Sequence, residues 1–153
     1  MLDSNLVLEN EQILLRPISE QDFSSLLPLA NDASLWKYFT YDLSIPTEFE
    51  EWVKPALVGQ RLQFVVWDKE TNQPVGSTAF GNFSERDERV EIGWTWLGRQ
   101  FHGSGINQAM KLLMLKYCFE TVKLKRVEFK TDVLNMPARK ALLKLGAIEE
   151  GIL

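Results

Sequence analysis

Residues 90–120, VEIGWTWLGRQFHGSGINQAMKLLMLKYCFE, decide the fold of this chain, because a strand, a glycine-bearing turn and a long helix follow one another there. Apolar residues occupy every second position over 90–97, which is the period of a strand. The turn GRQFHGSG, residues 98–105, cannot continue that strand, since its last two glycines permit positive φ angles. From Ile106 onward, apolar residues recur at helical spacing. The apolar positions expected to share one face of the strand are Val90, Ile92, Trp94 and Trp96.

A helix that begins directly after a glycine turn exposes backbone N–H groups that have no partner within the helix. With the helix dipole behind them, these donors form a binding site for a phosphate or another anion. A Rossmann turn would need a third glycine where Gln108 stands, and a P-loop would need lysine and serine or threonine where Ile106 and Asn107 stand. Neither of these phosphate-binding patterns fits the sequence.

The spacing Gln-x-x-Gly-x-Gly, formed here by Gln100, Gly103 and Gly105 after the strand EIGWTWL, resembles motif A of the GNAT superfamily of acyl-CoA-dependent N-acyltransferases. Residues 125–153, KRVEFKTDVLNMPARKALLKLGAIEEGIL, are similar to the strand, Asn-led helix and Leu-Gly turn that follow this motif in the family. Residues 13–27, ILLRPISEQDFSSLL, are similar to its first strand and helix. The resemblance spans nearly the whole chain and is closest to the ribosomal-protein N-terminal acetyltransferases.

The predicted order of elements is β-α-α-β-β-β-α-β-α, with hairpins early and crossovers late. We therefore expect an α/β (α+β) fold, a GNAT-like mixed and mostly antiparallel central sheet with helices on both faces, in one domain over residues 1–153. Gly76 and Gly81 are expected at bulges or close backbone approaches. The predicted strands cover 13–18, 63–68, 75–83, 90–97 and 126–132, and the predicted helices begin near Ser19, at a Thr47–Glu50 capping box, at Ile106 and at Asn135.

The resemblance also implies a C-terminal hairpin after Gly146, whereas the chain stops at Leu153, within the first strand of that hairpin. We therefore expect a truncated hairpin and an exposed sheet edge. An exposed edge invites pairing with another chain. Two explanations follow, a homodimer that covers the edge or the loss of the natural end of the chain.

Composition narrows the class of protein. Hydrophobic residues make up 45% and charged residues 25% of the chain, as in ordinary soluble globular proteins. No apolar run approaches the length of a membrane span and the start lacks a signal-peptide pattern, so we expect a cytoplasmic protein with no membrane partner. A single cysteine, Cys118, excludes an internal disulfide and gives no metal cluster, and its place in the apolar helix indicates an inert buried thiol.

The net charge of −4 hides an asymmetry between the two parts of the chain. Residues 1–97 hold 16 acidic and 7 basic side chains, giving −9, whereas residues 98–153 hold 5 acidic and 10 basic side chains, giving +5. A basic part that begins at the anion-binding turn suits a polyanionic ligand such as coenzyme A, although ordinary surface solvation explains any single lysine equally well. The acidic overall balance and the lack of a dense basic run argue against nucleic acid.

Transfer of an acyl group from a thioester requires a neutral amine, and a lysine-type amine with a pKa near 10.4 is mostly protonated at neutral pH. A general base therefore assists the reaction. Glu91 is the candidate, because it lies mid-strand, is expected on the opposite face from Ile92, Trp94 and Trp96, and matches a glutamate that the resembling family often uses as the base. The structural alternative is a solvent-facing or salt-bridged glutamate.

The resemblance implies that the remaining site residues bind the cofactor. Backbone groups of the Trp94 strand would bond the pantetheine arm, and one N–H group would polarise the thioester carbonyl. Asn135 would contact the same arm while it caps its helix. The tyrosine that serves many members as an acid is replaced by Leu142, so that acid is absent. The expected cofactor-binding residues are Trp94, Thr95, Trp96, Arg99, Gln100, Phe101, His102, Gly103, Ser104, Gly105 and Asn135.

The predicted function is an N-acetyltransferase that transfers an acetyl group from acetyl-CoA to a primary amine by direct attack in a ternary complex, with no metal. The acceptor would be a protein N-terminus, an amino acid or a small amine, bound near the aromatic segment 31–42 and the helix at Thr47. The acidic residues Asp42, Glu48, Glu50 and Glu51 in these regions would favour a cationic acceptor. The alternative is a non-catalytic acyl-CoA-binding or sensing module, favoured by the missing tyrosine and the short C-terminus.

Overall fold

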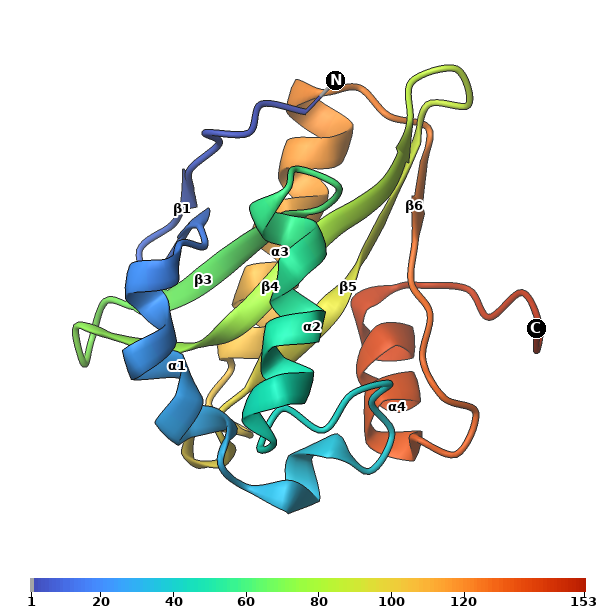
Figure 1. Ribbon diagram of the computed structural model, residues 1–153. Coiled ribbons are helices and arrows are strands. Elements are labelled where there is room, and N and C mark those ends of the chain that lie inside the picture. Colours follow the sequence, from blue (N-terminus) through green and yellow to red (C-terminus); the bar gives the residue numbers. More distant parts are fainter. Residues whose placement is uncertain (1) are drawn as a thin grey trace.

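A twisted six-stranded sheet runs through the computed structural model, which describes residues 2–153 (Figure 1). The strands lie in the sheet in sequence order, and every neighbouring pair is antiparallel except β5 and β6, which are parallel. This arrangement confirms the predicted mixed, mostly antiparallel sheet. The strands are β1 (Leu8–Glu9), β2 (Ile13–Pro17), β3 (Leu62–Asp68), β4 (Gln73–Ser84), β5 (Arg89–Leu97) and β6 (Arg126–Glu128).

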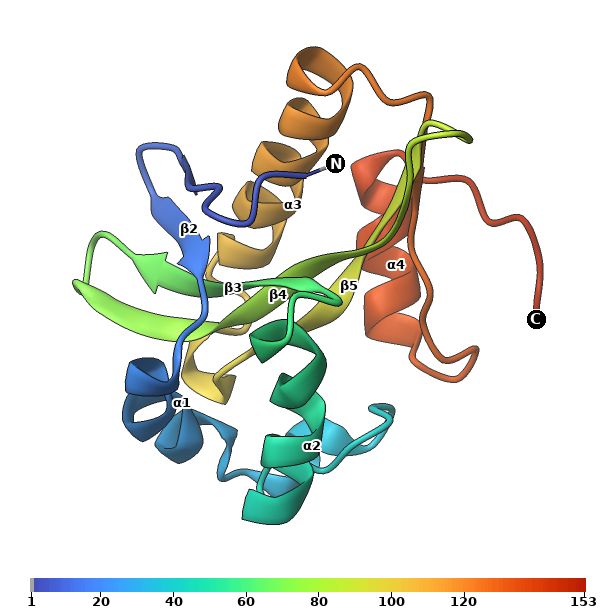
Figure 2. The same cartoon turned by 45° about the horizontal axis from the view of Figure 1, so that its top comes forward.

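Helices cover both faces of the sheet, as predicted. Figure 2 shows α3 (Ile106–Lys116) on one face and both α1 (Phe23–Ala30) and α2 (Pro46–Leu57) on the other, with α4 (Met136–Leu145) beside β5. Two apolar cores result, one on each side of the sheet. The core under α3 includes Ile13, Leu15, Phe64, Phe80, Ile92, Met110 and Met114, and the core under α1 and α2 includes Leu26, Trp36, Phe49, Trp52, Val65 and Trp96.

Strand β5 does not keep the strict alternation that its sequence predicts. Gly93 pairs with Ala79 and Trp96 pairs with Ser77, so three steps along β5 match two along β4. The extra residue is a β-bulge, and Trp94 within it has a φ of 51°. Because one added residue reverses the facing of the side chains that follow it, the predicted common face is wrong. Val90 and Ile92 pack in the α3 core, whereas Trp94 and Trp96 pack in the α1–α2 core.

Two glycines of β4 let β5 and its indole side chains approach closely, as predicted for Gly76 and Gly81. A Cβ atom at Gly81 would lie 2.4 Å from the ring of Trp94, so only glycine leaves room for this ring against the strand. A Cβ atom at Gly76 would lie 2.1 Å from the carbonyl oxygen of Trp96. The bulged strand and its neighbour therefore fit together only without these two side chains.

The helix starts agree with the sequence in three cases, including α3 at Ile106, and differ in one. Ser19 and Asp22 form a capping box before α1, and the Asn135 side chain accepts a hydrogen bond from the Ala138 amide at the start of α4. The predicted Thr47–Glu50 capping box is wrong, because the N-cap residue is Ile45 and α2 begins at Pro46. Proline suits the first position of a helix, where its missing N–H costs nothing.

The strands at the two edges of the sheet differ from the prediction. β1 was not predicted, and β6 ends at Glu128 instead of continuing to residue 132. Residues 147–153 form no strand, so within residues 2–153 nothing pairs with the outer edge of β6. Several apolar side chains are exposed nearby, among them Leu134, Leu143 and Ile148. Whether a second copy covers this edge stays a prediction.

The close approach of β4 and β5 generates a prediction about stability. We expect Gly76→Ala to lower the free energy of unfolding by about 2 kcal/mol or more, because its Cβ atom meets backbone that must move. Gly93→Ala is the matched control, since its Cβ atom would meet no atom closer than the Glu91 carboxylate at 3.6 Å. Urea unfolding followed by tryptophan fluorescence measures both variants. Equal losses in the two variants would contradict this account of the strand pair.

Candidate active site

The turn between β5 and α3 presents unpaired backbone amides. Gly103 and Gly105 have φ angles of 73° and 86°, and a Cβ atom at either position would meet nothing within 4 Å. Gly105 is the N-cap residue of α3. The space next to both glycines is open. Around the start of α3, the N–H groups of Gly103, Gly105, Asn107 and Gln108 have no acceptor among residues 2–153. Such a group of convergent donors at a helix start fits a diphosphate.

Three other residues of the turn hold it in place. The Phe101 ring packs against the α3 core, and the His102 ring nitrogen Nε2 lies 3.0 Å from the carbonyl oxygen of Leu97. The Ser104 hydroxyl donates to the carbonyl oxygen of Phe101 at 2.5 Å. These contacts give Phe101, His102 and Ser104 a supporting role that the amides of the turn depend on.

Arg99 points away from the unpaired amides. Its Nε donates to the carboxylate of Asp32 at 2.8 Å, and its Nη2 donates to the hydroxyl of Ser34. The ion pair of Arg99 with Asp32 connects the turn to the segment after α1, and it engages the Arg99 guanidinium. Gln100 beside it is exposed. Arg99, predicted to bind the cofactor, is therefore engaged with an acidic side chain of the protein instead.

One edge of β5 is unpaired where the family resemblance expects the pantetheine arm. The parallel pairing of β5 with β6 ends at the pair Glu91 and Glu128, and the chain after β6 then leads away toward α4 (Figure 1). Over residues 92–97 this edge of β5 has no strand partner within residues 2–153. Thr95 bonds the hydroxyl of Thr78 at 2.8 Å and Trp96 is buried, so the side chains serve the packing while the backbone edge is available.

Glu91 lies where β5 and β6 part. The residue is 6% exposed, and its Oε2 accepts hydrogen bonds from the Asn82 amide at 2.6 Å and the Lys130 ammonium at 3.0 Å. Glu91 is thus a salt-bridged glutamate, which was the structural alternative to the base. Glu91 shares a face with Gly93 and the bulged Trp94 rather than lying opposite Trp94 and Trp96.

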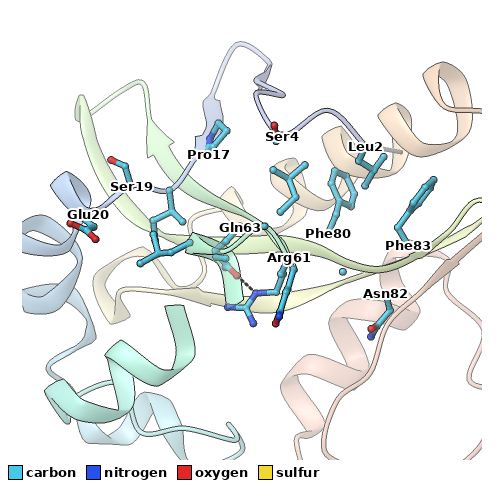
Figure 3. Close-up of a pocket in the computed structure, with 17 residues that line it drawn as sticks. Leu2, Ser4, Pro17, Ser19, Glu20, Arg61, Gln63, Phe80, Asn82 and Phe83 are labelled. Atoms are coloured by element: carbon cyan, nitrogen blue, oxygen red, sulfur yellow. Dashed lines mark hydrogen bonds between the residues drawn. The ribbon is translucent and has the colours of Figure 1, made fainter. Parts of the chain in front are cut away.

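A cavity of about 550 Å³ is lined by residues from the N-terminal segment, the end of α2, and strands β3 and β4, including Asn82, the residue that bonds Glu91 (Figure 3). Asn82, which bonds Glu91, lines it together with Gly81. Arg61 also lines it, and burial lowers the pKa of its guanidinium to about 10, with the phenol of Tyr41 opposing the shift. Sequence reasoning missed Asn82, Lys130 and Arg61. A signal for Asn82 exists only in the structure, where its φ of 48° marks a second bulge, in β4.

Other candidates for chemistry lie outside this region. Cys118 is 1% exposed in the α3 core, and burial raises the pKa of its thiol to about 12, which agrees with the predicted inert cysteine. Within residues 2–153, no three His, Cys, Asp or Glu side chains are placed to hold a metal ion. No helix of the described chain is long and apolar enough to cross a membrane.

Comparison with known proteins matches this geometry to a family. The family model described as "Acetyltransferase (GNAT) domain" matches residues 12–148. N-acetyltransferase p20 of Bacillus licheniformis is 28% identical over 151 residues, which are 95% of this chain and 84% of p20. YdaF of Bacillus subtilis, provisionally named a ribosomal N-acetyltransferase, is 26% identical and aligns over 93% of this chain and 81% of its own length.

Solved structures show the same fold. A GCN5-related N-acetyltransferase from Brucella melitensis superposes with a TM-score of 0.89 at 21% identity, covering 97% of this chain and 70% of that one. Spermidine N-acetyltransferase from Vibrio cholerae, solved with CoA and spermine, superposes with a TM-score of 0.76 at 23% identity, covering 94% and 85%. The family match over residues 12–148 shows that this chain belongs to the GNAT acetyltransferases and is an N-acetyltransferase that uses acetyl-CoA.

Proposed function

We propose that the chain transfers an acetyl group from acetyl-CoA to a primary amine by direct attack in a ternary complex, with Glu91 as the general base. The observation that carries this proposal is a buried carboxylate placed at the point where β5 leaves β6, bonded by Asn82, which lines a cavity large enough for a small acceptor. Small-molecule sites are commonly cavities of this size with a few convergent polar groups.

The proposed cofactor site has two parts. The unpaired amides of Gly103, Gly105, Asn107 and Gln108 would hold the diphosphate of coenzyme A, and the free backbone edge of β5 at Trp94, Thr95 and Trp96 would bond the pantetheine arm. Acetyl-CoA supplies the activated thioester when it is bound. A backbone N–H of the bulge would stabilise the charge that develops on its carbonyl oxygen. Asn135 stays a candidate contact, although its side chain already caps α4.

Proton transfer is the part of the reaction that this chain's side chains supply. An α-amino group has a pKa near 8, and a base that removes its proton increases the fraction able to attack. Glu91 can accept that proton directly or through a water molecule, while Asn82 and Lys130 hold its carboxylate in place. Leu142 offers no acid for the departing thiolate, whose pKa of about 8.5 permits it to leave unaided.

The acceptor classes that follow from the sequence are a protein N-terminus, an amino acid and a small amine. The name of YdaF points to the first class for that protein, and the bound spermine of the Vibrio cholerae enzyme points to the third class for that enzyme. A screen of amines for the release of free CoA thiol distinguishes transfer from the alternative, a module that binds acyl-CoA without catalysis. Such a module would bind the cofactor and release no thiol with any amine.

Replacement of the base gives the first functional prediction. We expect Glu91→Gln to lower kcat about 10²- to 10⁴-fold, because an amide cannot take the proton of the amine. The affinity for acetyl-CoA should stay within about twofold, since the proposed cofactor contacts are backbone groups elsewhere. Steady-state thiol release and calorimetric titration with acetyl-CoA measure the two quantities.

The matched control is Glu128→Gln, the same chemical change at the residue that pairs with Glu91 across the two strands. Glu128 forms ion pairs with Arg126 and Arg89 instead of bonding Asn82 and Lys130. We expect it to retain turnover. An unchanged kcat in Glu91→Gln would remove Glu91 from the mechanism.

The cofactor turn gives the second functional prediction. We expect Gly105→Val to weaken acetyl-CoA binding about tenfold or more, because a β-branched residue resists the left-handed backbone that aims the amides at the ligand. Gly146→Val is the control, since Gly146 also has a left-handed backbone and open space around it but ends α4. The control should lose stability and keep its affinity. Calorimetric titration that finds wild-type affinity in folded Gly105→Val would rule out the turn as the diphosphate site.

A further inference from the structure

Arg61 is held rigidly at the wall of the cavity beside Glu91. Its guanidinium carbon lies 5.6 Å from the centroid of the Trp52 ring and 5.1 Å from that of the Trp94 ring, so the group sits against two indoles. Its Nε donates to Gln63 Oε1 at 2.6 Å, and its Nη2 donates to the carbonyl oxygen of Trp52 at 2.5 Å. Gln63 is fixed in turn by a 2.7 Å hydrogen bond to Ser77. The orientation of the guanidinium is therefore set by the protein alone.

Unlike the other arginines of the described chain, Arg61 has no acidic partner. Among residues 2–153 no carboxylate lies within 4.0 Å of its side-chain nitrogens, and its Nη1 has no hydrogen-bond acceptor. Glu20, the acidic side chain that also lines the cavity, makes no ion pair with it. Every other arginine of the described chain pairs with an Asp or Glu, namely Arg16, Arg86, Arg89, Arg99, Arg126 and Arg139.

A partly buried guanidinium without a counter-ion is costly, because burial removes water from the charge and only neutral hydrogen-bond acceptors and aromatic rings compensate for it. A rigid guanidinium with a free Nη1 is also the group that recognises a carboxylate best, through short charge-assisted hydrogen bonds. The arrangement is thus matched to an anion that arrives from outside the chain. The alternative is a purely structural role, in which Arg61 serves only to donate a hydrogen bond to the Trp52 carbonyl oxygen in α2.

The cavity connects Arg61 with Asn82, the residue that bonds the proposed base. Figure 3 shows Arg61 and Gln63 at the centre of the lining, with Asn82 on the β4 side, and Asn82 bonds Glu91 directly. The ring of Trp94 contacts Arg61 and lies over Gly81, the residue that pairs with Glu91. An acceptor that directs its amine toward Glu91 can therefore reach Arg61 with another part of the same molecule. Much of the remaining lining is apolar, including Pro17, Ile18, Leu57, Leu62 and Phe83.

We propose that Arg61 binds a carboxylate of the acceptor, so that the substrates of this enzyme are primary amines that carry a carboxylate a few bonds from the amine. This proposal rests on the proposed function, because it assumes that the cavity beside Glu91 is the acceptor site. A preference for a carboxylate is the opposite of the cationic acceptor that the acidic residues near the helix at Thr47 led us to expect. Two of those residues are already engaged, since Glu48 accepts from the Asp42 amide and Asp42 accepts from Ser44. A polyamine would meet an unpaired cation in this cavity and is disfavoured.

The test uses matched linear ligands that differ in the sign of one end group. Each ω-amino carboxylate from glycine to 6-aminohexanoate is paired with the diamine of similar length, for example 4-aminobutyrate with 1,4-diaminobutane. Calorimetric titration measures their binding to the wild type, to Arg61→Gln and to Arg61→Lys, with and without coenzyme A. Arg86→Gln is the matched control, because the Arg86 side chain is 96% exposed and does not line the cavity.

We expect at least one carboxylate to bind the wild type about tenfold or more tightly than its diamine. Arg61→Gln should weaken that carboxylate by about 10- to 100-fold, the range for a hydrogen bond to a charged group, without weakening the diamine. Arg61→Lys should restore part of the preference, and Arg86→Gln should leave it intact. A purely structural role for Arg61 would instead weaken both ligands alike or neither.

The proposal is overturned if no carboxylate binds the wild type more tightly than its diamine, or if Arg61→Gln weakens the two ligands equally. Binding of coenzyme A and release of thiol from acetyl-CoA, measured on the same wild-type protein, report on the proposed function separately. A protein that selects carboxylates through Arg61 but releases no thiol would refute acetyl transfer and leave the Arg61 site standing. A protein that acetylates diamines as well as carboxylates would support transfer and refute the site.

Discussion

The bulge at Trp94 is the constraint on which the rest of the site depends. One residue more in β5 than in the facing part of β4 reverses the side chains that follow it. Ile92 therefore packs under α3, whereas Trp96 packs under α1 and α2. The bulge also lays the Trp94 ring over Gly81, where it meets the Arg61 guanidinium. A regular β5 would have placed neither the aromatic wall of the cavity nor the backbone groups proposed to bind the thioester arm.

Charge placement divides the site into parts with different tasks. The turn before α3 offers backbone donors and little side-chain charge of its own, since Arg99 is paired with Asp32. Glu91 has a cationic partner in Lys130, which keeps a buried carboxylate acceptable within the fold. Arg61 has none. This difference is the basis for proposing Glu91 as the general base and Arg61 as the group that binds the carboxylate of the acceptor.

Much of the fold could be predicted from sequence because the signals were local. The capping residues Ser19 and Asn135, the left-handed Gly105 and Gly146 and the helical spacing after Ile106 act within one turn of chain, and each has the predicted conformation. The bulge in β5, the short length of β6 and the partners of Glu91 depend on which strands lie side by side, and no local pattern encodes that. Arg61 was missed for the same reason, since a lone arginine before a strand is normally a solvated charge.

The central claim is that the backbone amides at the start of α3 bind the diphosphate of coenzyme A and so direct its thioester toward Glu91. A crystal structure of the protein with coenzyme A tests this claim most directly. The account predicts diphosphate oxygens within hydrogen-bonding distance of the amides of Gly103, Gly105, Asn107 and Gln108, and the thiol near the Trp94 bulge. A cofactor bound elsewhere, or a turn that closes on its own side chains and excludes it, would contradict the account.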